Sequence, residues 1–276
     1  MVAIGKIKAC IAARNLRLYG ERDVPVDENE ISALARSKAP YMYQMFIGTA
    51  NQDAGAALDS KLYLLRKAIE AKLTDEIYVA SLSSQTLVYK GMLRAKEVSA
   101  FYTDLQDERF VSALALVHSR YSTNTFPSWE RAHPNRMIVH NGEINTIRGN
   151  MSWFNAKAKR LDGGKLPQII DPEGSDSAIF DNVLEFLTYH GFSLPHAVMM
   201  MVPELGKVTV NYPNIFAISM NLPAEQWNRG MGRWHLVSAM ANKSEPFWIA
   251  TVCVPHVTIS LMTTRSYSHR RSVLPI

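Results

Sequence analysis

Two polar clusters near the middle of the chain carry residue types that acyl-transfer chemistry uses. They are HSRYSTNT at residues 118–125 and HNGEINT at residues 140–146. Arg120 has a planar fork of donors that suits a substrate carboxylate. Asn141 and Gly142 combine a side-chain amide with a backbone amide that no Cβ shields, and such a pair can stabilise an oxyanion. The same residues could instead form a structural ion pair and a hairpin turn, and spacing alone favours that interpretation.

Short apolar runs precede both clusters and predict the elements that position them. SALALV (residues 112–117) comes before the first cluster, and RMIV (136–139) comes before the second. Runs of this length that end in Ser, Thr, Asn and Gly are typical of buried strands, so both clusters are expected at strand ends lining one cleft. A third candidate, Asp176, stands before an apolar run with helical spacing. A helix is therefore expected to begin at Ser175 or Asp176, where Asp176 could simply act as its cap.

The order and length of these motifs resemble a known family. RYSTNT, HNGEINT and EGSDS (residues 173–177) resemble the glutaminase domain of class II glutamine amidotransferases. The longer stretches ALVHSRYSTNTFPSW, HNGEINTIRGN and SDSAIFDNVLEFL resemble the large subunit of the glutamate synthases in particular. The resemblance implies the α+β fold of the N-terminal nucleophile hydrolases, an αββα sandwich of two antiparallel sheets. It covers residues 1–204, which match an interior part of that domain, so the sandwich is expected to be incomplete.

The resemblance also implies roles for individual residues. In such enzymes glutamine is held by its α-carboxylate and its ammonium group, and an oxyanion is stabilised while glutamate and ammonia form. The residues that hold the α-carboxylate correspond to Arg120, Tyr121 and Thr123. The ammonium group is held by the residue that corresponds to Asp176, and the oxyanion by those that correspond to Asn141 and Gly142. The resemblance therefore predicts L-glutamine as the ligand.

Partners and cofactors follow from the same resemblance. Ammonia would pass to synthase domains that convert 2-oxoglutarate to glutamate, with FMN and an iron–sulfur cluster that this segment does not encode. A small subunit or ferredoxin would supply electrons. The implied biological role is glutamate biosynthesis and ammonia assimilation.

The expected nucleophile does not match. The family uses an N-terminal cysteine whose α-amino group can activate the thiol, with a glycine after it. This chain begins Met1-Val2-Ala3, and Cys10 lacks the glycine and stands too close to the VPVD motif at residues 24–27. Cys10 is therefore expected to be a small buried apolar residue. The chain is expected to be inactive by itself, or a remnant with at most weak glutamine binding.

Composition indicates a globular chain. Of its 276 residues, 47% are hydrophobic, which is enough for a core. Cys10 and Cys253 are far apart and indicate neither a disulfide framework nor a metal site. No apolar run is long enough for a membrane span, and no signal peptide is recognisable, so a cytoplasmic chain that contacts no membrane is expected.

The net charge of +5 lies entirely in the last quarter of the chain. Residues 205–276 hold seven basic and two acidic residues, so residues 1–204 hold 23 of each sign. A basic tail of this kind could bind nucleic acid. Nucleic-acid binding is therefore an alternative function. A shifted reading frame in the same segment does not favour it.

Residues 205–271 lose the family pattern in a way that indicates a shifted reading frame. Back-translated and read from the third base of each codon, FWIATVCVPHVT (residues 247–258) gives LDRNGLRPARY. The same shift turns QWNRGMG (226–232) into MEPWDG, and both products resemble glutamate synthase motifs in the right order. The match resumes at residues 272–276. The segment is therefore interpreted as a frameshift product.

The remaining patterns predict scaffold elements. We expect a buried strand at residues 40–47 and an amphipathic helix at 58–73 with its charges on the face opposite the apolar residues. A strand, a turn and a second strand are expected at 78–93. A helix at 95–110 and a basic helix ending at Gly163-Gly164 complete the set.

Overall fold

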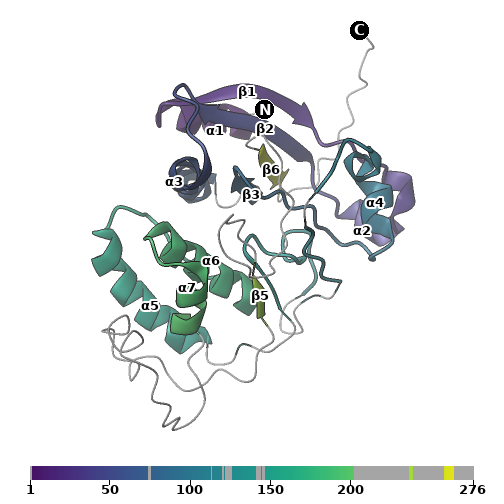
Figure 1. Cartoon of the computed structure of the whole chain (residues 1–276). Helices are drawn as coiled ribbons and strands as arrows, with labels where there is room; N and C mark the ends of the chain where they lie inside the picture. The colour runs from purple at the N-terminus through teal and green to yellow at the C-terminus, as the bar shows by residue number, and fades with distance from the viewer. Residues whose placement is uncertain are drawn as a thin grey trace. The chain divides into compact units, whose positions relative to one another are not determined.

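The computed structural model describes residues 2–73, 76–112, 114–119, 121, 126–140, 144, 147–201, 236–238 and 258–263 (Figure 1). They form two compact units, residues 1–136 with 239–276 and residues 137–238. Helices and antiparallel strands occur together, which confirms the α+β class. The stacking of two sheets in a sandwich stays a prediction.

A four-stranded antiparallel sheet forms the centre of the first unit. Its order is β1-β2-β6-β3. The strands are β1 (Leu16–Asp23), β2 (Met42–Thr49), β3 (Ile77–Ser83) and β6 (Thr258–Thr263). β2 confirms the strand expected at 40–47. β6 pairs with β2 and β3 on either side, so a stretch of the segment interpreted as frameshifted lies inside this sheet.

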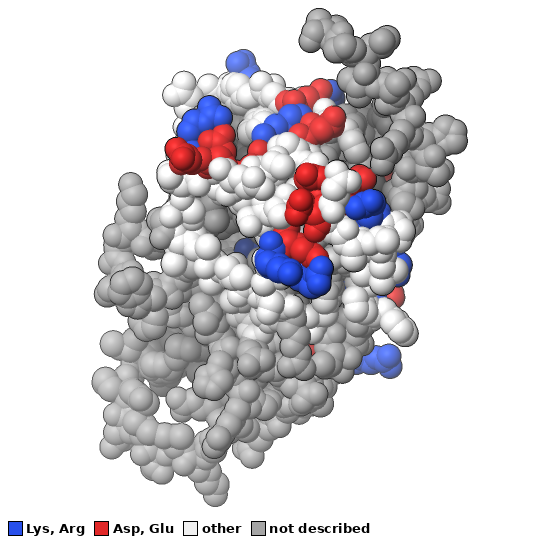
Figure 2. Space-filling view, turned by 90° about the vertical axis from the view of Figure 1, so that its right-hand side faces the viewer, with Lys and Arg blue, Asp and Glu red and all other residues white. Residues whose placement is uncertain are grey.

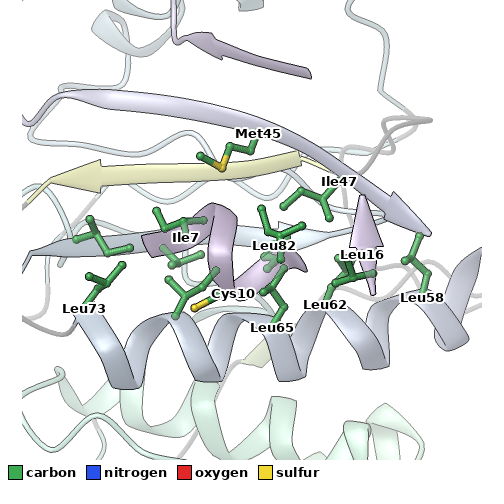
Figure 3. Close-up of a cluster of buried hydrophobic side chains, with 14 residues drawn as sticks. Ile7, Cys10, Leu16, Met45, Ile47, Leu58, Leu62, Leu65, Leu73 and Leu82 are labelled. Atoms are coloured by element: carbon green, nitrogen blue, oxygen red, sulfur yellow. The ribbon is translucent and has the colours of Figure 1, made fainter. Parts of the chain in front are cut away.

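Helices α1 (Val2–Ala12) and α3 (Gly55–Leu73) pack with this sheet around one apolar core. The helix expected at 58–73 is confirmed. Leu58, Leu62, Leu65, Ile69 and Leu73 recur three or four residues apart along α3, so they share one face of the helix. Figure 3 shows leucines of this face directed toward β2 residues such as Met45 and Ile47. The five α3 residues and both β2 residues are buried.

Cys10 lies in the same core as a free thiol with 0% exposure. This confirms that it is a small buried apolar residue. The chain leaves α1 through Asn15, whose φ of 55° lies in the left-handed region that asparagine tolerates. The turn leads directly into β1.

Some charged residues of α3 are buried. Arg66 is 0% exposed and Lys67 is buried. Both pair with Glu70, at 2.6 Å from Arg66 Nη1 to Glu70 Oε1 and 3.2 Å from Lys67 Nζ to Oε2. Arg136, from elsewhere in the chain, lies 3.3 Å from the same Oε1. The periodicity of α3 could not show this, because Arg136 covers the cluster from outside the helix.

The ionisation of Glu70 reflects these neighbours. Burial opposes the charged form, but the positive charges of Arg66, Lys67 and Arg136 outweigh it and lower the Glu70 pKa to about 2. Glu70 is thus the common anion of three cations.

The helix predicted at 95–110 is wrong as a single element. It is split into α4 (Glu97–Phe101) and the 3₁₀ helix η2 (Thr103–Gln106). Tyr102 separates them with extended backbone angles, φ −88° and ψ 94°. Its backbone bridges to Val26, and its hydroxyl donates to the Lys90 carbonyl at 2.7 Å. These long-range contacts replace the helical continuation.

The second strand predicted within 78–93 is also wrong, because residues 84–93 form no strand. Side chains take over the backbone bonds there. Asp59 of α3 accepts from the Ser84 N–H at 2.7 Å, and Ser81 Oγ accepts from the Val88 N–H at 3.2 Å. The segment is therefore an anchored loop.

The buried strand predicted at 112–117 is wrong for residues 112 and 114–117, which form no strand, and Val117 is 76% exposed. The strand predicted at 136–139 is confirmed as the buried β4 (Ile138–His140). The two runs look alike in sequence, but only the second has a pairing partner among the described residues.

The remaining short helices of the first unit connect β1 to β2. They are η1 (Glu28–Glu30) and α2 (Ala33–Ser37). Asp27 caps η1 by accepting from the Asn29 N–H, and Ser32 caps α2 by accepting from the Ala35 N–H.

The second unit pairs β4 with β5 (Leu236–Ser238) and adds three helices, α5 (Ile147–Asp162), α6 (Asp176–Tyr189) and α7 (Leu194–Met201). α5 confirms the predicted basic helix, and it is followed directly by Gly163 and Gly164, whose φ values are 65° and 75°. Phe154 of α5 meets Phe186 of α6 edge to face, with ring centroids 5.3 Å apart. No helix among the described residues is long and apolar enough to cross a lipid bilayer.

Gly91 gives a direct test of packing in the first unit. A Cβ at this position would overlap the ring of Trp129, which is buried and donates from Nε1 to the Ala35 carbonyl at 3.2 Å. Gly91→Ala is expected to lower the free energy of unfolding by roughly 1–3 kcal/mol. Gly5→Ala in α1 meets nothing within 4 Å and is expected to raise it by about 0.5–1 kcal/mol. Urea denaturation of the two variants would measure both effects, and equal effects would contradict this packing.

Candidate functional site

The structure describes two of the six predicted site residues. Tyr121 belongs to the first unit and Asp176 to the second. The other four lie outside the described residues: Arg120, Thr123, Asn141 and Gly142. The meeting of all six around one ligand therefore stays a prediction.

Tyr121 is anchored through its hydroxyl, which donates to the Gly91 carbonyl at 2.9 Å. Burial raises the pKa of Tyr121, and the nearby charge of Glu130 adds to the shift. The phenol therefore stays neutral and keeps its proton to donate near neutral pH. Its bond ties the residue next to Arg120 to the loop that follows β3.

Asp176 is the first residue of α6, as the sequence predicted, and it is half-buried. The cap is Ser175, whose side chain accepts from the Ala178 N–H at 3.2 Å. Asp176 Oδ1 instead accepts from the Ser177 N–H at 2.7 Å and from Ser177 Oγ at 3.2 Å. The two hydrogen bonds from Ser177 thus hold the carboxylate, although it does not cap the helix. A carboxylate in this position can pair with a ligand ammonium group.

His140 connects the end of β4 to the start of α6. Its Nε2 lies 2.5 Å from Ser177 Oγ, and both side chains are buried. His140 is the residue immediately before the predicted oxyanion pair. A continuous set of polar contacts therefore leads from the end of β4 to the Asp176 carboxylate.

Asp181 holds the other end of β4. It is 0% exposed, and its Oδ1 accepts from the N–H groups of Met137 at 2.7 Å and Ile138 at 3.1 Å. Asp181 and Ser177 are four residues apart and so lie on one face of α6. The helix binds the strand at both ends through this pair.

Sequence reasoning missed His140, Ser177 and Asp181. For Ser177 and Asp181 a weak signal was present, because they are polar residues at helical spacing within a largely apolar run. Such residues, when buried, need partners from another element. The sequence gives no indication that the partner is β4.

Within the described part of the chain, no three His, Cys, Asp or Glu side chains group closely enough to hold a metal ion. Charged side chains of the first unit tend to pair, as in Lys8 with Glu21 at 2.7 Å and Arg22 with Asp104 at 2.5 Å. The face drawn in Figure 2 accordingly shows acidic and basic groups side by side. The described residues on that face form no uniformly basic surface of the kind nucleic acids prefer.

Comparison with known proteins identifies the relatives of this chain. The sequence model of the class-II glutamine amidotransferases matches residues 2–213. The chain is 47% identical over 210 residues to "Glutamate synthase [NADPH] large chain" of Bacillus subtilis (strain 168), covering 72% of this chain and 14% of that protein.

Two further relatives extend the comparison. "Glutamate synthase [NADH]" of Saccharomyces cerevisiae is 45% identical over 208 residues, which is 70% of this chain and 10% of that protein. "Ferredoxin-dependent glutamate synthase, chloroplastic" of Oryza sativa subsp. japonica is 40% identical over 216 residues, which is 72% of this chain and 13% of that protein. The predicted resemblance is confirmed, and the alignments span only 10% to 14% of the length of these relatives.

Proposed function

Because the chain belongs to the class-II glutamine amidotransferases, we propose that it is the glutaminase domain of a glutamate synthase and that its ligand is L-glutamine. The observation that carries the proposal is the 47% identity to a glutamate synthase large chain over 210 residues. In the complete enzyme this domain hydrolyses glutamine to glutamate and ammonia. The ammonia serves glutamate biosynthesis from 2-oxoglutarate in other domains, which carry the FMN and the iron–sulfur cluster.

The proposed binding mode uses each group of glutamine. Arg120, with Tyr121 and Thr123, binds the α-carboxylate, since a guanidinium can form two parallel bonds to a carboxylate. Asp176 binds the ammonium group. Asn141 and Gly142 donate to the side-chain carbonyl oxygen, where negative charge develops when a thiolate attacks. The half-buried carboxylate of Asp176 at the start of α6 supports this assignment.

Partners and location belong to the same proposal. The relatives named above use NADPH, NADH or ferredoxin, so a small subunit or ferredoxin is the proposed source of electrons, and the cytoplasm is the proposed location.

We further propose that the 276-residue chain binds glutamine without hydrolysing it. Attack on the amide requires a thiolate in contact with the substrate. Cys10 is fully buried among apolar side chains of α1, β1 and α3, and Cys253 lies outside the described residues. No thiol among the described residues is therefore in a position to attack.

An ammonia-release assay tests this directly. The purified chain is expected to bind L-glutamine and to release ammonia no faster than buffer. Cys10→Ala is expected to leave glutamine affinity unchanged, within about twofold, while it lowers stability by about 1 kcal/mol because it removes a buried sulfur atom. Circular dichroism would verify that the variant is folded. Ammonia release by the chain, whether or not it survives Cys10→Ala, would contradict the proposal.

The interpretation of residues 205–271 as a frameshift product is part of the proposal. Sequencing the coding DNA around the codon for Glu204 tests it, since a single frame change is expected there and a second one near residue 271. An unbroken frame whose codons do not give LDRNGLRPARY when shifted would refute it. The alternative, nucleic-acid binding by the basic tail, predicts salt-sensitive binding that disappears when the chain is truncated after Glu204.

A further inference from the structure

The contacts between β4 and α6 bear on how the Asp176 carboxylate is oriented. Asp176 is only half-buried and stands at a helix end, where a side chain by itself has several accessible rotamers. Ser177 donates two hydrogen bonds to Asp176 Oδ1, one from the backbone N–H and one from Oγ. Ser177 thus holds the carboxylate in one orientation through Oδ1.

The number of hydrogens on the Ser177 hydroxyl determines which partner donates the hydrogen bond between Ser177 and His140. The Ser177 hydroxyl has one hydrogen. If that hydrogen is donated to Asp176 Oδ1, the hydroxyl can only accept from its other neighbour. His140 Nε2, 2.5 Å away, must then carry the proton. The result is a relay of donors, from imidazole to hydroxyl to carboxylate, directed at one anionic oxygen.

Hydrogen bonds at both ends of β4 join the strand to α6, which carries Ser177. Asp181 accepts two backbone N–H groups at the start of β4, and His140 meets Ser177 at its end. Because Ser177 and Asp181 occupy one face of α6, strand and helix are joined at two points one helical turn apart. A carboxylate held through these contacts keeps its place relative to the end of β4 at His140.

From this geometry we infer that His140 and Ser177 are positioning residues that hold the Asp176 carboxylate ready for the ammonium group of the ligand. The inference rests on the proposed function and deepens it, because it names the residues that set recognition of the amino group. Neither residue contacts the ligand. Both act through Asp176.

Two ligands separate this role from general structural support. L-glutamine has the ammonium group, whereas glutaramate is the same molecule without it. Ser177→Ala removes the hydroxyl donor to Asp176 and is expected to weaken L-glutamine binding roughly tenfold, since bonds to charged groups are the stronger ones. It should leave glutaramate binding unchanged, because Asp176 contributes nothing to that ligand. Ser152→Ala, at an exposed serine of α5, is the matched control and should change neither.

Isothermal titration of the full chain with both ligands has distinct outcomes. Selective loss of L-glutamine binding in Ser177→Ala supports the inference. Equal loss for both ligands would show a merely structural role, and no loss for either would show that Ser177 does not orient Asp176, so each overturns it. Failure of the unaltered chain to bind L-glutamine at all would instead refute the proposed function.

A second measurement does not depend on any ligand. Long-range ¹H–¹⁵N correlation spectra of the unaltered chain are expected to show His140 protonated at Nε2, with a resonance that changes in Ser177→Ala and stays the same in Ser152→Ala. An Nε2 without a proton in the unaltered chain would overturn the relay, even if glutamine binds.

Discussion

Replacing Glu70 by glutamine is expected to lower the free energy of unfolding by roughly 3–5 kcal/mol, the cost of removing one partner from a buried ion pair. The Glu70 carboxylate pairs with Arg66, Lys67 and Arg136, and Arg66 and Lys67 are buried. A neutral amide keeps the size of the side chain but no longer balances these charges. Equilibrium denaturation in urea at pH 7 would measure the difference.

Glu76→Gln is the matched control. Glu76 also forms an ion pair, 2.5 Å from Lys6 Nζ, but both side chains are more than 40% exposed. Exposed pairs contribute only about 0–1 kcal/mol, so this variant should be close to the unaltered chain. If Glu70→Gln is no more destabilising than Glu76→Gln, the buried cluster does not stabilise the first unit.

The effect of Glu70 also has a predictable pH dependence. Its pKa is lowered to about 2 in the folded chain from an ordinary 4.5. A carboxyl with a depressed folded pKa contributes stability that is fully present above the unfolded value and is lost as pH falls toward the folded value. The shift corresponds to about 3 kcal/mol as an upper figure, because the Glu70 side chain keeps 30% exposure. The difference in the free energy of unfolding between the unaltered chain and Glu70→Gln should therefore become smaller as the pH falls from 4.5 to 2.

The second large effect is expected at Asp176. Asp176→Asn should weaken L-glutamine binding by about 30-fold or more, since losing one partner of a desolvated charge pair costs about 2–5 kcal/mol. The variant should remain folded, because Ser175 supplies the α6 cap. Titration calorimetry with L-glutamine measures the affinity, and thermal unfolding checks the fold.

Asp171→Asn is the control for charge alone. Asp171 stands in the loop before α6, is exposed, and accepts from the Glu173 N–H at 3.0 Å. It should not affect binding. Equal losses in the two variants would show that general negative charge, rather than the position of Asp176, attracts the ligand.

The sequence predicted those elements whose signals are local. α3 and α6 have apolar residues at helical spacing, and β4 is a short buried run, so each was found near its observed bounds. The predictions failed where distant residues decide. Tyr102 interrupts the helix at 95–110 by bridging to Val26, and Asp59 takes backbone bonds from the segment expected as a second strand. The run at 112–117 has the composition of a strand, but its described residues, 112 and 114–117, form none.

The same limit applies to the site. Asp176 was predicted at the start of a helix from its neighbours in sequence, and it lies there. The contact between His140 and Ser177 joins residues 37 positions apart. No local pattern encodes that contact, because it exists only once β4 has packed on α6.

We propose that Arg120, the Asn141–Gly142 pair and Asp176 bind one molecule of glutamine. A crystal structure of the chain soaked with L-glutamine tests it most directly. The Asp176 carboxylate is expected within hydrogen-bond distance of the ligand ammonium group, with the Arg120 guanidinium on the α-carboxylate and Asn141 and Gly142 at the side-chain carbonyl oxygen. Glutamine bound away from Asp176, or these groups on surfaces that one small amino acid cannot span, would contradict the account.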